Sequence, residues 1–204
     1  MRIVGILLAA GTGSRFGGGK LLAALPAMSG DAAAAAPIGA IACRHMIAAL
    51  PETVAVVRTG DDALAGLLEA EGARVVRCVR ADEGMGASLA CGVAAASDAD
   101  GWVVALADMP WIAVETIARV AAAIADGATV AAPFVRGVRG HPVGFAAALR
   151  DALVSLGGDE GARDIVNRQA HGLVRVDVDD GAILRDVDTP ADLVAGAAIG
   201  RLLG

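Results

Sequence analysis

The sequence predicts an α/β protein, a single Rossmann-like domain in which helices cover both faces of a mostly parallel sheet in three layers. Short apolar segments alternate along the chain with helical stretches, which is typical of this class. The apolar segments are continuous, and such runs suit strands buried on both faces of a parallel sheet. The length of 204 residues suffices for one such domain, and we find no internal repeat. We therefore expect one domain over residues 1–204.

The expected elements follow from these patterns. The predicted strands cover residues 3–8, 53–58, 73–78, 102–107, 129–133 and 173–178. The predicted helices cover residues 38–50, 61–71, 86–96, 114–125, 146–156 and 162–170. A last helix should begin at Thr189, which can cap it, with Pro190 in its first position. Asp192, three residues after Thr189, would complete a start similar to a capping box. Residues 27–37 are rich in alanine, and we interpret them as an exposed excursion, with a helix extension as the alternative.

Composition argues against several classes of protein. Aromatic residues make up 2% of the chain and the net charge is −6, whereas a nucleic-acid binder needs stacking platforms and a basic surface. No uncharged apolar run is long enough for a membrane span, and no signal peptide is visible, so we expect a cytoplasmic protein. Cys43, Cys78 and Cys91 lie far apart without a C-x-x-C pair, which predicts reduced structural thiols and no zinc site.

A glycine-rich loop follows the first expected strand. It contains Gly11, Gly13 and the glycines of residues 17–19, together with the cations Arg15 and Lys20. Glycines take positive φ angles and let the backbone approach a ligand closely. Backbone amides and fixed cations then suit a polyphosphate. Because ligands of parallel sheets bind at the carboxyl ends of the strands, this loop predicts a nucleotide site.

Two common phosphate-binding motifs do not fit this loop. A dinucleotide fingerprint needs G-x-G-x-x-G, but the spacing from Gly11 to Gly17 is one residue too long, which weakens the case for an NAD-dependent enzyme. A P-loop needs G-x-x-x-x-G-K-[ST], but Ser14 replaces its first glycine and Leu21 follows Lys20. The hydroxyl group that would hold magnesium in a P-loop is therefore missing.

The loop nevertheless has a specific pattern, L-A-A-G-x-G-x-R-F-G-G-x-K over residues 8–20. It resembles the signature loop of the MobA-like nucleotidyltransferases, whose fold is that of the nucleotide-diphospho-sugar transferases. The resemblance implies that this loop binds the nucleotide through Leu8, Ala9, Ala10, Gly11, Gly13, Ser14, Arg15 and Lys20.

A second stretch, G-M-G-A-S-L from Gly84, opens a predicted helix. It resembles the G-M-[SG]-x-S-L motif of the molybdenum-cofactor cytidylyltransferases within the same family. The resemblance implies that Gly84, Met85 and Ser88 line the nucleotide pocket. From spacing alone, this stretch could equally be a loop–helix junction in which Ser88 caps the helix.

Acidic residues follow two other elements. Asp108 comes after a strongly apolar strand, in a turn that Pro110 fixes, and a carboxylate there can hold Mg²⁺ against phosphate oxygens. The resemblance implies the same role for Asp108. The later stretch D-V-D-T-P resembles the family's D-[IV]-D-T-P and offers Asp188, or alternatively Asp186, as a further Mg²⁺ ligand. Helix capping with both acids exposed stays open as an alternative.

Two further stretches resemble the same branch of the family. They are R-G-H-P from Arg139 and G-D-E-G-A-R from residue 158. The resemblance implies that Arg139, His141 and Asp159 contact the second substrate, with His141 orienting a phosphate group or that substrate instead of acting as a general base. The amides of the second stretch, at a helix start, can meet an anion. Without the resemblance, a lone histidine is usually structural, and the second stretch would be a capped helix start with a solvated charge cluster.

The resemblance implies a Mg²⁺-dependent transfer of a nucleotide from CTP to molybdopterin, with Arg15, Lys20 and Asp108 as catalytic residues. The attacking phosphate oxygen is already anionic, so positioning and charge neutralisation suffice. Another triphosphate or phosphorylated acceptor is one alternative, and a non-catalytic protein that binds and delivers molybdenum cofactor is another. A molybdoenzyme or its chaperone is the expected protein partner. We expect the protein to bind neither nucleic acid nor a membrane.

Overall fold

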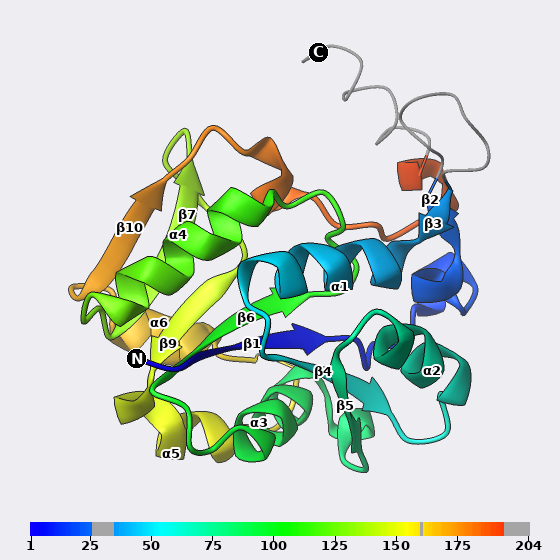
Figure 1. The fold of residues 1–204 in the computed structure, drawn as a ribbon, viewed down its shortest axis with the longest axis horizontal. Coiled ribbons are helices and arrows are strands. Elements are labelled where there is room, and N and C mark those ends of the chain that lie inside the picture. The colour runs from blue at the N-terminus through cyan, green and yellow to red at the C-terminus, as the bar shows by residue number, and fades with distance from the viewer. Residues whose placement is uncertain (26–34, 160, 194–204) are drawn as a thin grey trace.

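A mostly parallel sheet runs through the centre of the computed structural model, which describes residues 1–25, 35–159 and 161–193 (Figure 1). Its strand order is β10-β7-β9-β6-β1-β4-β5, with β8 paired to β7. The strands that share one direction are β1 (Ile3–Leu8), β4 (Thr53–Arg58), β5 (Arg74–Cys78), β6 (Gly101–Leu106), β7 (Val130–Val135) and β10 (Leu173–Asp177). The strands β8 (Val138–Arg139) and β9 (Val143–Ala146) run antiparallel to their neighbours.

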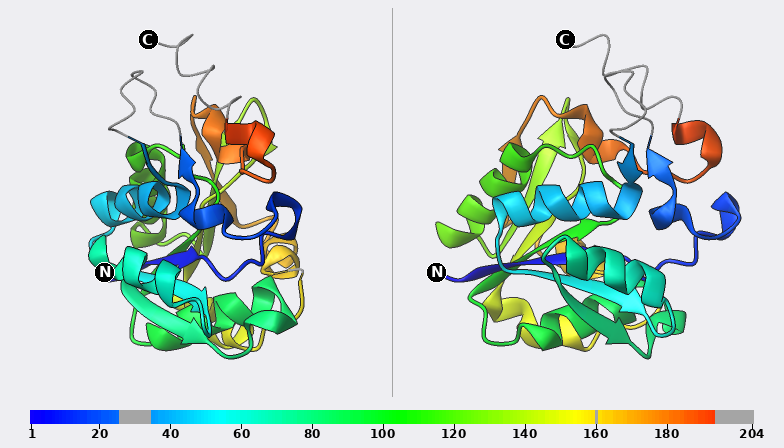
Figure 2. Two further views of the ribbon diagram at one scale, coloured as in Figure 1. Left: turned by 90° about the vertical axis from the view of Figure 1, so that its right-hand side faces the viewer. Right: turned by 45° about the vertical axis from the view of Figure 1, so that its right-hand side comes forward.

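Helices cover both faces of this sheet, as predicted (Figures 1 and 2). One layer consists of α1 (Ile38–Ala49), α2 (Asp62–Ala70) and α4 (Val114–Ala125). The other layer consists of α3 (Met85–Ala95), α5 (Arg150–Val154) and α6 (Arg163–Arg168). Short 3-10 helices lie between these elements, at Ser14–Phe16, Lys20–Leu22, Ala81–Glu83, Ala147–Leu149 and Gly181–Leu184.

The two helix layers explain why the strands are continuously apolar. In β1, Val4 and Ile6 belong to the core under α3 and α5, whereas Leu7 belongs to the core under α1, α2 and α4. In β6, Trp102 and Val103 divide between the two cores in the same way. Because successive strand residues point to opposite faces, both faces need apolar side chains. The predicted three-layer α/β class is confirmed.

The antiparallel strand β9 is the main departure from the predicted elements. It lies between β6 and β7 and pairs with both. The helix expected over residues 146–156 is therefore wrong in its first turn, because Ala146 ends β9 and α5 begins only at Arg150. A Cβ atom on Gly144 would come within 2.6 Å of Ile124 in α4, so the close packing of α4 on β9 requires a glycine there. Four residues are too few to show a strand periodicity.

Two expected segments fall partly on residues that the structure does not describe. Of the excursion over residues 27–37, residues 27–34 lie outside the described part, and Ala36 and Pro37 pair with Leu25 and Ala24 in a two-stranded ladder. Of the last helix, residues 194–204 lie outside it. The start of that helix is as predicted, because an oxygen of Asp192 accepts the backbone N–H of Thr189 at 2.7 Å.

The expectation of three reduced thiols is wrong for two of them. Cys78, at the end of β5, and Cys91, in α3, form a disulfide with their Cα atoms 5.9 Å apart. The chain returns over β5 in α3, and this packing brings the two residues together. Cys43 is a free thiol in α1, and its burial raises its pKa to about 11. The cysteines therefore give no support to the predicted cytoplasmic location.

Among the described residues, no helix is long and apolar enough to cross a membrane.

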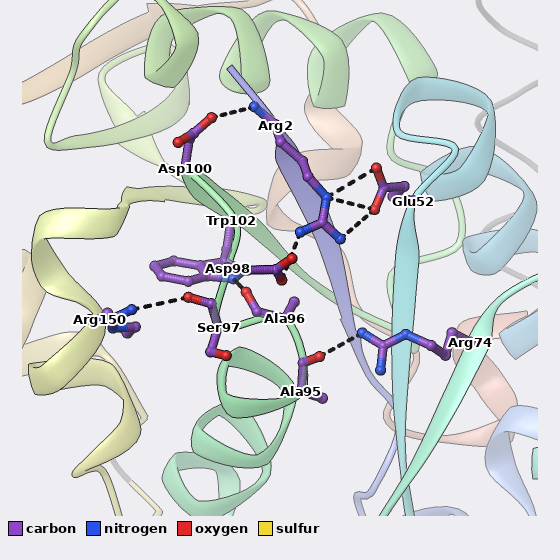
Figure 3. Close-up of polar contacts among 10 residues, drawn as sticks. All are labelled: Arg2, Glu52, Arg74, Ala95, Ala96, Ser97, Asp98, Asp100, Trp102 and Arg150. Atoms are coloured by element: carbon purple, nitrogen blue, oxygen red, sulfur yellow. Dashed lines mark hydrogen bonds and ion pairs between the residues drawn. The ribbon is translucent and has the colours of Figure 1, made fainter.

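An ion-pair network joins the amino ends of three strands (Figure 3). The Arg2 guanidinium contacts Glu52 at 2.6 Å and Asp98 at 2.7 Å, and its backbone N–H donates to Asp100 at 2.7 Å. Arg2, Glu52 and Asp100 directly precede β1, β4 and β6. The hydrogen bonds from Arg2 lower the pKa of Glu52 and that of Asp98.

The segment formed by the last residue of α3 and the two residues after it is held at the same end of the sheet. Three side chains donate to its consecutive carbonyl groups at residues 95–97, namely Arg74 at 2.8 Å, Trp102 at 3.0 Å and Arg150 at 3.1 Å (Figure 3). The Trp102 ring is fully buried under this segment. The polar groups of the amino end are thus used to hold the fold together.

Candidate functional site

A cavity of about 780 Å³ lies at the opposite end of the sheet, where the parallel strands end. Leu8, Arg58 and Leu106, the last residues of β1, β4 and β6, all border it. The strands β4 and β6 flank β1 on its two sides. Most residues predicted to bind the nucleotide line this cavity, namely Leu8, Ala9, Ala10, Gly11, Gly13, Lys20, Gly84, Met85 and Ser88.

The glycine loop adopts the backbone conformations predicted for it. Gly13 has φ 58° and Gly19 has φ 63°, and both glycines between Phe16 and Gly19 also have positive φ angles. Such angles are costly for residues with a Cβ atom. The carbonyl of Gly13 accepts the backbone N–H of Phe16 at 3.0 Å and that of Gly18 at 3.2 Å. The loop therefore folds back on itself, and Lys20 returns to the cavity.

The two cations of the loop both contact acids at the mouth of the cavity. Lys20 Nζ lies 2.7 Å from Asp108 Oδ2 and 3.7 Å from Asp188 Oδ1. Arg15 Nη1 lies 2.6 Å from Asp188 Oδ2. The Lys20 side chain is only 12% exposed, whereas that of Arg15 is 77% exposed. Lys20 thus lines the cavity and contacts its carboxylates, whereas Arg15 lies outside the lining and contacts Asp188.

Three carboxylates converge at this point. Asp108, Asp186 and Asp188 each offer an oxygen, and these oxygens lie within 4.8 Å of one another. The backbone N–H of the buried Val187 donates to the carbonyl of Asp108 at 2.8 Å, which joins the two acidic segments. Asp108 Oδ1 is buried without a hydrogen-bond partner among the described residues. An orphaned buried carboxylate oxygen in a set of hard oxygen donors fits a divalent cation such as Mg²⁺.

The start of α3 forms another wall of the cavity. Gly84 precedes the helix with φ 117°, and a Cβ atom there would overlap Asp159 and the carbonyl of Gly158. The backbone N–H of Gly86 donates to that carbonyl at 2.8 Å, so the 158–159 segment is seated on the helix start. Ser88 is buried and its hydroxyl donates to the carbonyl of Gly84 at 3.3 Å. Gly84, not Ser88, is therefore the residue that caps the helix.

A second cavity of about 390 Å³ adjoins the first. The two share Leu8, Met85, Leu106 and Asp159 as lining residues. Apolar side chains form most of the second cavity, and its other polar side chains are Arg139, His141 and Arg163. The structure thus brings together the three residues predicted to contact the second substrate, Arg139, His141 and Asp159. Glu160 of the same motif lies outside the described residues.

His141 is held rigidly at the edge of this second cavity. Its backbone N–H donates to the carbonyl of Ile183 at 3.0 Å, and Gly140 packs so closely on Ile183 that no Cβ atom would fit. Burial lowers the pKa of His141, so its imidazole is neutral near pH 7. Its Nδ1 atom is buried and has no hydrogen-bond partner within the described part of the chain. A neutral imidazole with an unused nitrogen can bind a ligand group.

Some residues of the predicted site lie apart, and others were missed. Ser14 is exposed and borders neither cavity, and Arg15 reaches the site only through Asp188. Arg58 and Asp82 line the large cavity without having been predicted. For Arg58, the sequence did offer a signal, because it is the single cation at the end of the mostly apolar strand T-V-A-V-V-R.

Comparison with known proteins identifies the family and the fold of the chain. The sequence model of the family described as MobA-like NTP transferase domain matches residues 5–173. Nicotine blue oxidoreductase of Paenarthrobacter nicotinovorans is 32% identical over 200 residues and 92% of each chain. The purine catabolism protein PucB of Bacillus subtilis is 30% identical over 204 residues and 93% of each chain. The crystal structure of Rv0371c from Mycobacterium tuberculosis superposes with a TM-score of 0.80 at 26% identity, covering 97% of this chain and 98% of that one.

The chain therefore belongs to the MobA-like NTP transferase family, and the predicted family is confirmed. The solved structure also confirms the predicted nucleotide-diphospho-sugar-transferase-like fold. The protein is a nucleotidyltransferase of this family.

Proposed function

We propose that this protein transfers a nucleoside monophosphate from CTP to a phosphorylated acceptor, the molybdopterin of the molybdenum cofactor, and releases pyrophosphate. The observation that carries the proposal is the pairing of Lys20 and Arg15 with Asp108 and Asp188 at the mouth of a nucleotide-sized cavity. Such a set of cations and carboxylates is what a metal-bound triphosphate needs. We further propose that the chain acts as one domain, and that it works in the cytoplasm.

The phosphate end of the reaction is assigned to the glycine loop. We propose that Lys20 and Arg15 exchange their carboxylate partners for the triphosphate when the nucleotide binds. An anionic phosphate oxygen of the acceptor attacks the α-phosphorus, a new P–O bond forms, and the bond between the α-phosphorus and the bridging oxygen breaks. Lys20 and Arg15 then offset the charge that develops on the leaving pyrophosphate.

Asp108, Asp186 and Asp188 are the residues that would hold Mg²⁺. Bound there, Mg²⁺ would neutralise phosphate charge and favour an in-line arrangement of the attacking and leaving oxygens. The orphaned Oδ1 of Asp108 supports this assignment, because a buried carboxylate oxygen without a donor is costly unless a ligand completes it. A structure of Rv0371c in complex with manganese has the same fold.

The second cavity is the proposed acceptor site. Its apolar walls suit a flat ring system, and Arg139, Arg163 and His141 can receive a phosphate group. Asp159 borders both cavities and can orient an acceptor toward the nucleotide. A receiving molybdoenzyme or its chaperone is the proposed partner for the product.

Two alternatives define the experiment. One is a protein that carries molybdenum cofactor without catalysis, and the other is a redox enzyme, since one relative is named an oxidoreductase. Purified protein is incubated with Mg²⁺, each of the four ribonucleoside triphosphates in turn and molybdenum cofactor, and products are identified by mass spectrometry. A parallel reaction with NADH or NADPH measures oxidation of the coenzyme.

The proposed function predicts a cytosine dinucleotide of molybdopterin, pyrophosphate in equal amount, and no coenzyme oxidation. Pyrophosphate with a different nucleotide or acceptor would keep the reaction class and change the substrate. Tight cofactor binding without pyrophosphate under all conditions would identify a carrier and overturn the proposal.

A further inference from the structure

Arg58 occupies a position in the large cavity that the proposed function leaves without a role. It is the last residue of β4, and its side chain is 29% exposed. Its Nη2 donates to the carbonyl of Ala10 at 3.3 Å, and its Nη1 forms an ion pair with Asp82. Ala10 follows β1 and Asp82 lies in the 3-10 helix before α3. Contacts from two other segments thus fix the guanidinium in the cavity wall.

The strand order places this guanidinium away from the phosphate-binding groups. Asp108 follows β6, and Arg58 ends β4, on the opposite side of β1. Both residues line the same cavity. A nucleotide whose triphosphate lies at Asp108 and Lys20 can therefore extend its base toward Arg58. Leu64 in α2, which follows β4, and Ala81, which follows β5, also line the cavity and offer apolar atoms to a ring.

The two charged groups have hydrogen-bonding capacity to spare. A guanidinium carries five N–H donors in one plane, and the contacts to Ala10 and Asp82 engage two of its nitrogens. Asp82 is 82% exposed and has free acceptor sites. The other acid of this wall, Asp61, is already engaged, because its side chain accepts the backbone N–H of Leu64 at the start of α2. The wall therefore presents donors from Arg58 beside an acceptor from Asp82.

We propose that the Arg58–Asp82 pair reads the nucleobase and selects cytosine, an inference that rests on the proposed nucleotidyl transfer. Cytosine presents two adjacent acceptors, O2 and N3, followed by the N4 amino donor, which matches donors from Arg58 and an acceptor from Asp82. Uracil presents an N3–H and an O4 in the same places, so both the guanidinium and the carboxylate would face groups of the wrong kind. An unmatched polar group in a partly buried site lowers affinity.

The competing interpretation is that Arg58 binds phosphate, as many arginines do. Tripolyphosphate distinguishes phosphate binding from base recognition, because it would occupy the phosphate end of the site and has no base. Binding of CTP, UTP, GTP and tripolyphosphate with Mg²⁺ is measured by calorimetry for the wild type and for Arg58→Gln, Arg58→Lys and Asp82→Asn. Arg77→Gln is the matched control, because Arg77 pairs with the exposed acids Asp62 and Glu69 and borders neither cavity.

The expected result is a change confined to the base. Arg58→Gln and Arg58→Lys should weaken CTP binding by about tenfold or more, because a hydrogen bond from a charged donor is lost or misplaced, and leave tripolyphosphate within about twofold. Asp82→Asn should raise the affinity for UTP relative to CTP by about fivefold or more, since an amide can donate to uracil O4. Arg77→Gln should change none of these values, and thermal unfolding of each variant verifies its fold.

Three results would overturn the inference. They are an equal loss of CTP and tripolyphosphate affinity in Arg58→Gln, an unchanged CTP to UTP ratio in Asp82→Asn, and tighter wild-type binding of GTP than of CTP. If the wild type binds both CTP and tripolyphosphate, such a result removes only the role of Arg58 and Asp82. If the wild type binds neither, the proposed function fails as well.

Discussion

The two ends of the sheet use their charged residues in opposite ways. At the amino end, Arg2 faces Glu52, Asp98 and Asp100, and its charge is shared among exposed partners (Figure 3). At the carboxyl end, three carboxylates crowd within 4.8 Å, and one oxygen of Asp108 has no hydrogen-bond partner among the described residues. At the amino end the cation is paired with acids, whereas at the carboxyl end like charges crowd together in an arrangement that suits a cationic ligand.

The difference has an energetic meaning. Exposed ion pairs such as that of Arg2 and Glu52 contribute little to stability, because water screens them and ordering the side chains costs entropy. Like charges held together in a partly buried site oppose folding, and they persist when a function requires them. The comparison predicts that substitutions at the carboxyl end change activity, and that substitutions at the amino end change stability.

The largest expected effect is at Asp108. Asp108→Asn keeps the shape of the side chain and an acceptor for Lys20 but removes the charge that would hold Mg²⁺. We expect pyrophosphate release from CTP and acceptor to fall by about a thousandfold, or roughly 4 kcal/mol of transition-state stabilisation. The matched variant is Asp100→Asn at the amino end, which should keep wild-type activity. Wild-type turnover by Asp108→Asn would show that the three carboxylates are not the metal site.

The next effect is at the amino end and concerns stability. Trp102 is fully buried and its indole N–H donates to the carbonyl of Ala96 at 3.0 Å. Trp102→Ala should lower the free energy of unfolding by about 3 kcal/mol, because it leaves a cavity and an unpaired carbonyl. Denaturant unfolding measures this loss. Turnover per folded molecule should stay near that of the wild type, and a selective loss of turnover would mean that the two ends of the sheet are coupled.

Lys20 provides a third test, because its ammonium group contacts a carboxylate that we propose holds the metal ion. Lys20→Met removes the ammonium group that lies 2.7 Å from Asp108 Oδ2. We expect Mn²⁺ alone to bind about tenfold more tightly and tripolyphosphate with Mg²⁺ to bind more weakly, since one charge then no longer opposes the cation or attracts the anion. Titration calorimetry separates the two effects. Weaker Mn²⁺ binding by Lys20→Met would contradict the proposed exchange of partners.

The sequence was sufficient for those parts of the molecule that depend on local pattern. Continuous apolar runs indicated strands buried on both faces, and glycines marked the positions where the loop has positive φ angles. The acids after β6 and before the last helix were found for the same reason, since each follows or precedes a clear element. Their convergence within 4.8 Å was an expectation from the family resemblance, and spacing alone could not supply it.

The parts that were missed depend on contacts between distant segments. The strand β9 is defined by its pairing with β6 and β7 and not by its own four residues. The disulfide of Cys78 and Cys91 depends on how α3 packs on β5. The position of Arg58 in the cavity wall depends on the carbonyl of Ala10 and on Asp82, which other segments bring to it. Such contacts require the register of neighbouring elements, which composition and periodicity do not contain.

The smallest expected effect concerns the Arg2 network and its dependence on pH. Hydrogen bonds from Arg2 lower the pKa of Glu52 and that of Asp98 in the folded protein. Their stabilising effect is therefore present above the unfolded pKa values of about 4.3 and 3.9, and it is lost as the pH falls through the folded values. Arg2→Met should lower the melting temperature slightly at pH 7, and the difference from the wild type should shrink below about pH 4. It should also shrink in high salt, because these charges are exposed. A difference that stays the same from pH 7 to pH 3 would show that Arg2 acts through packing, and the amino end would then owe its stability to the core under Trp102 instead of to its charges.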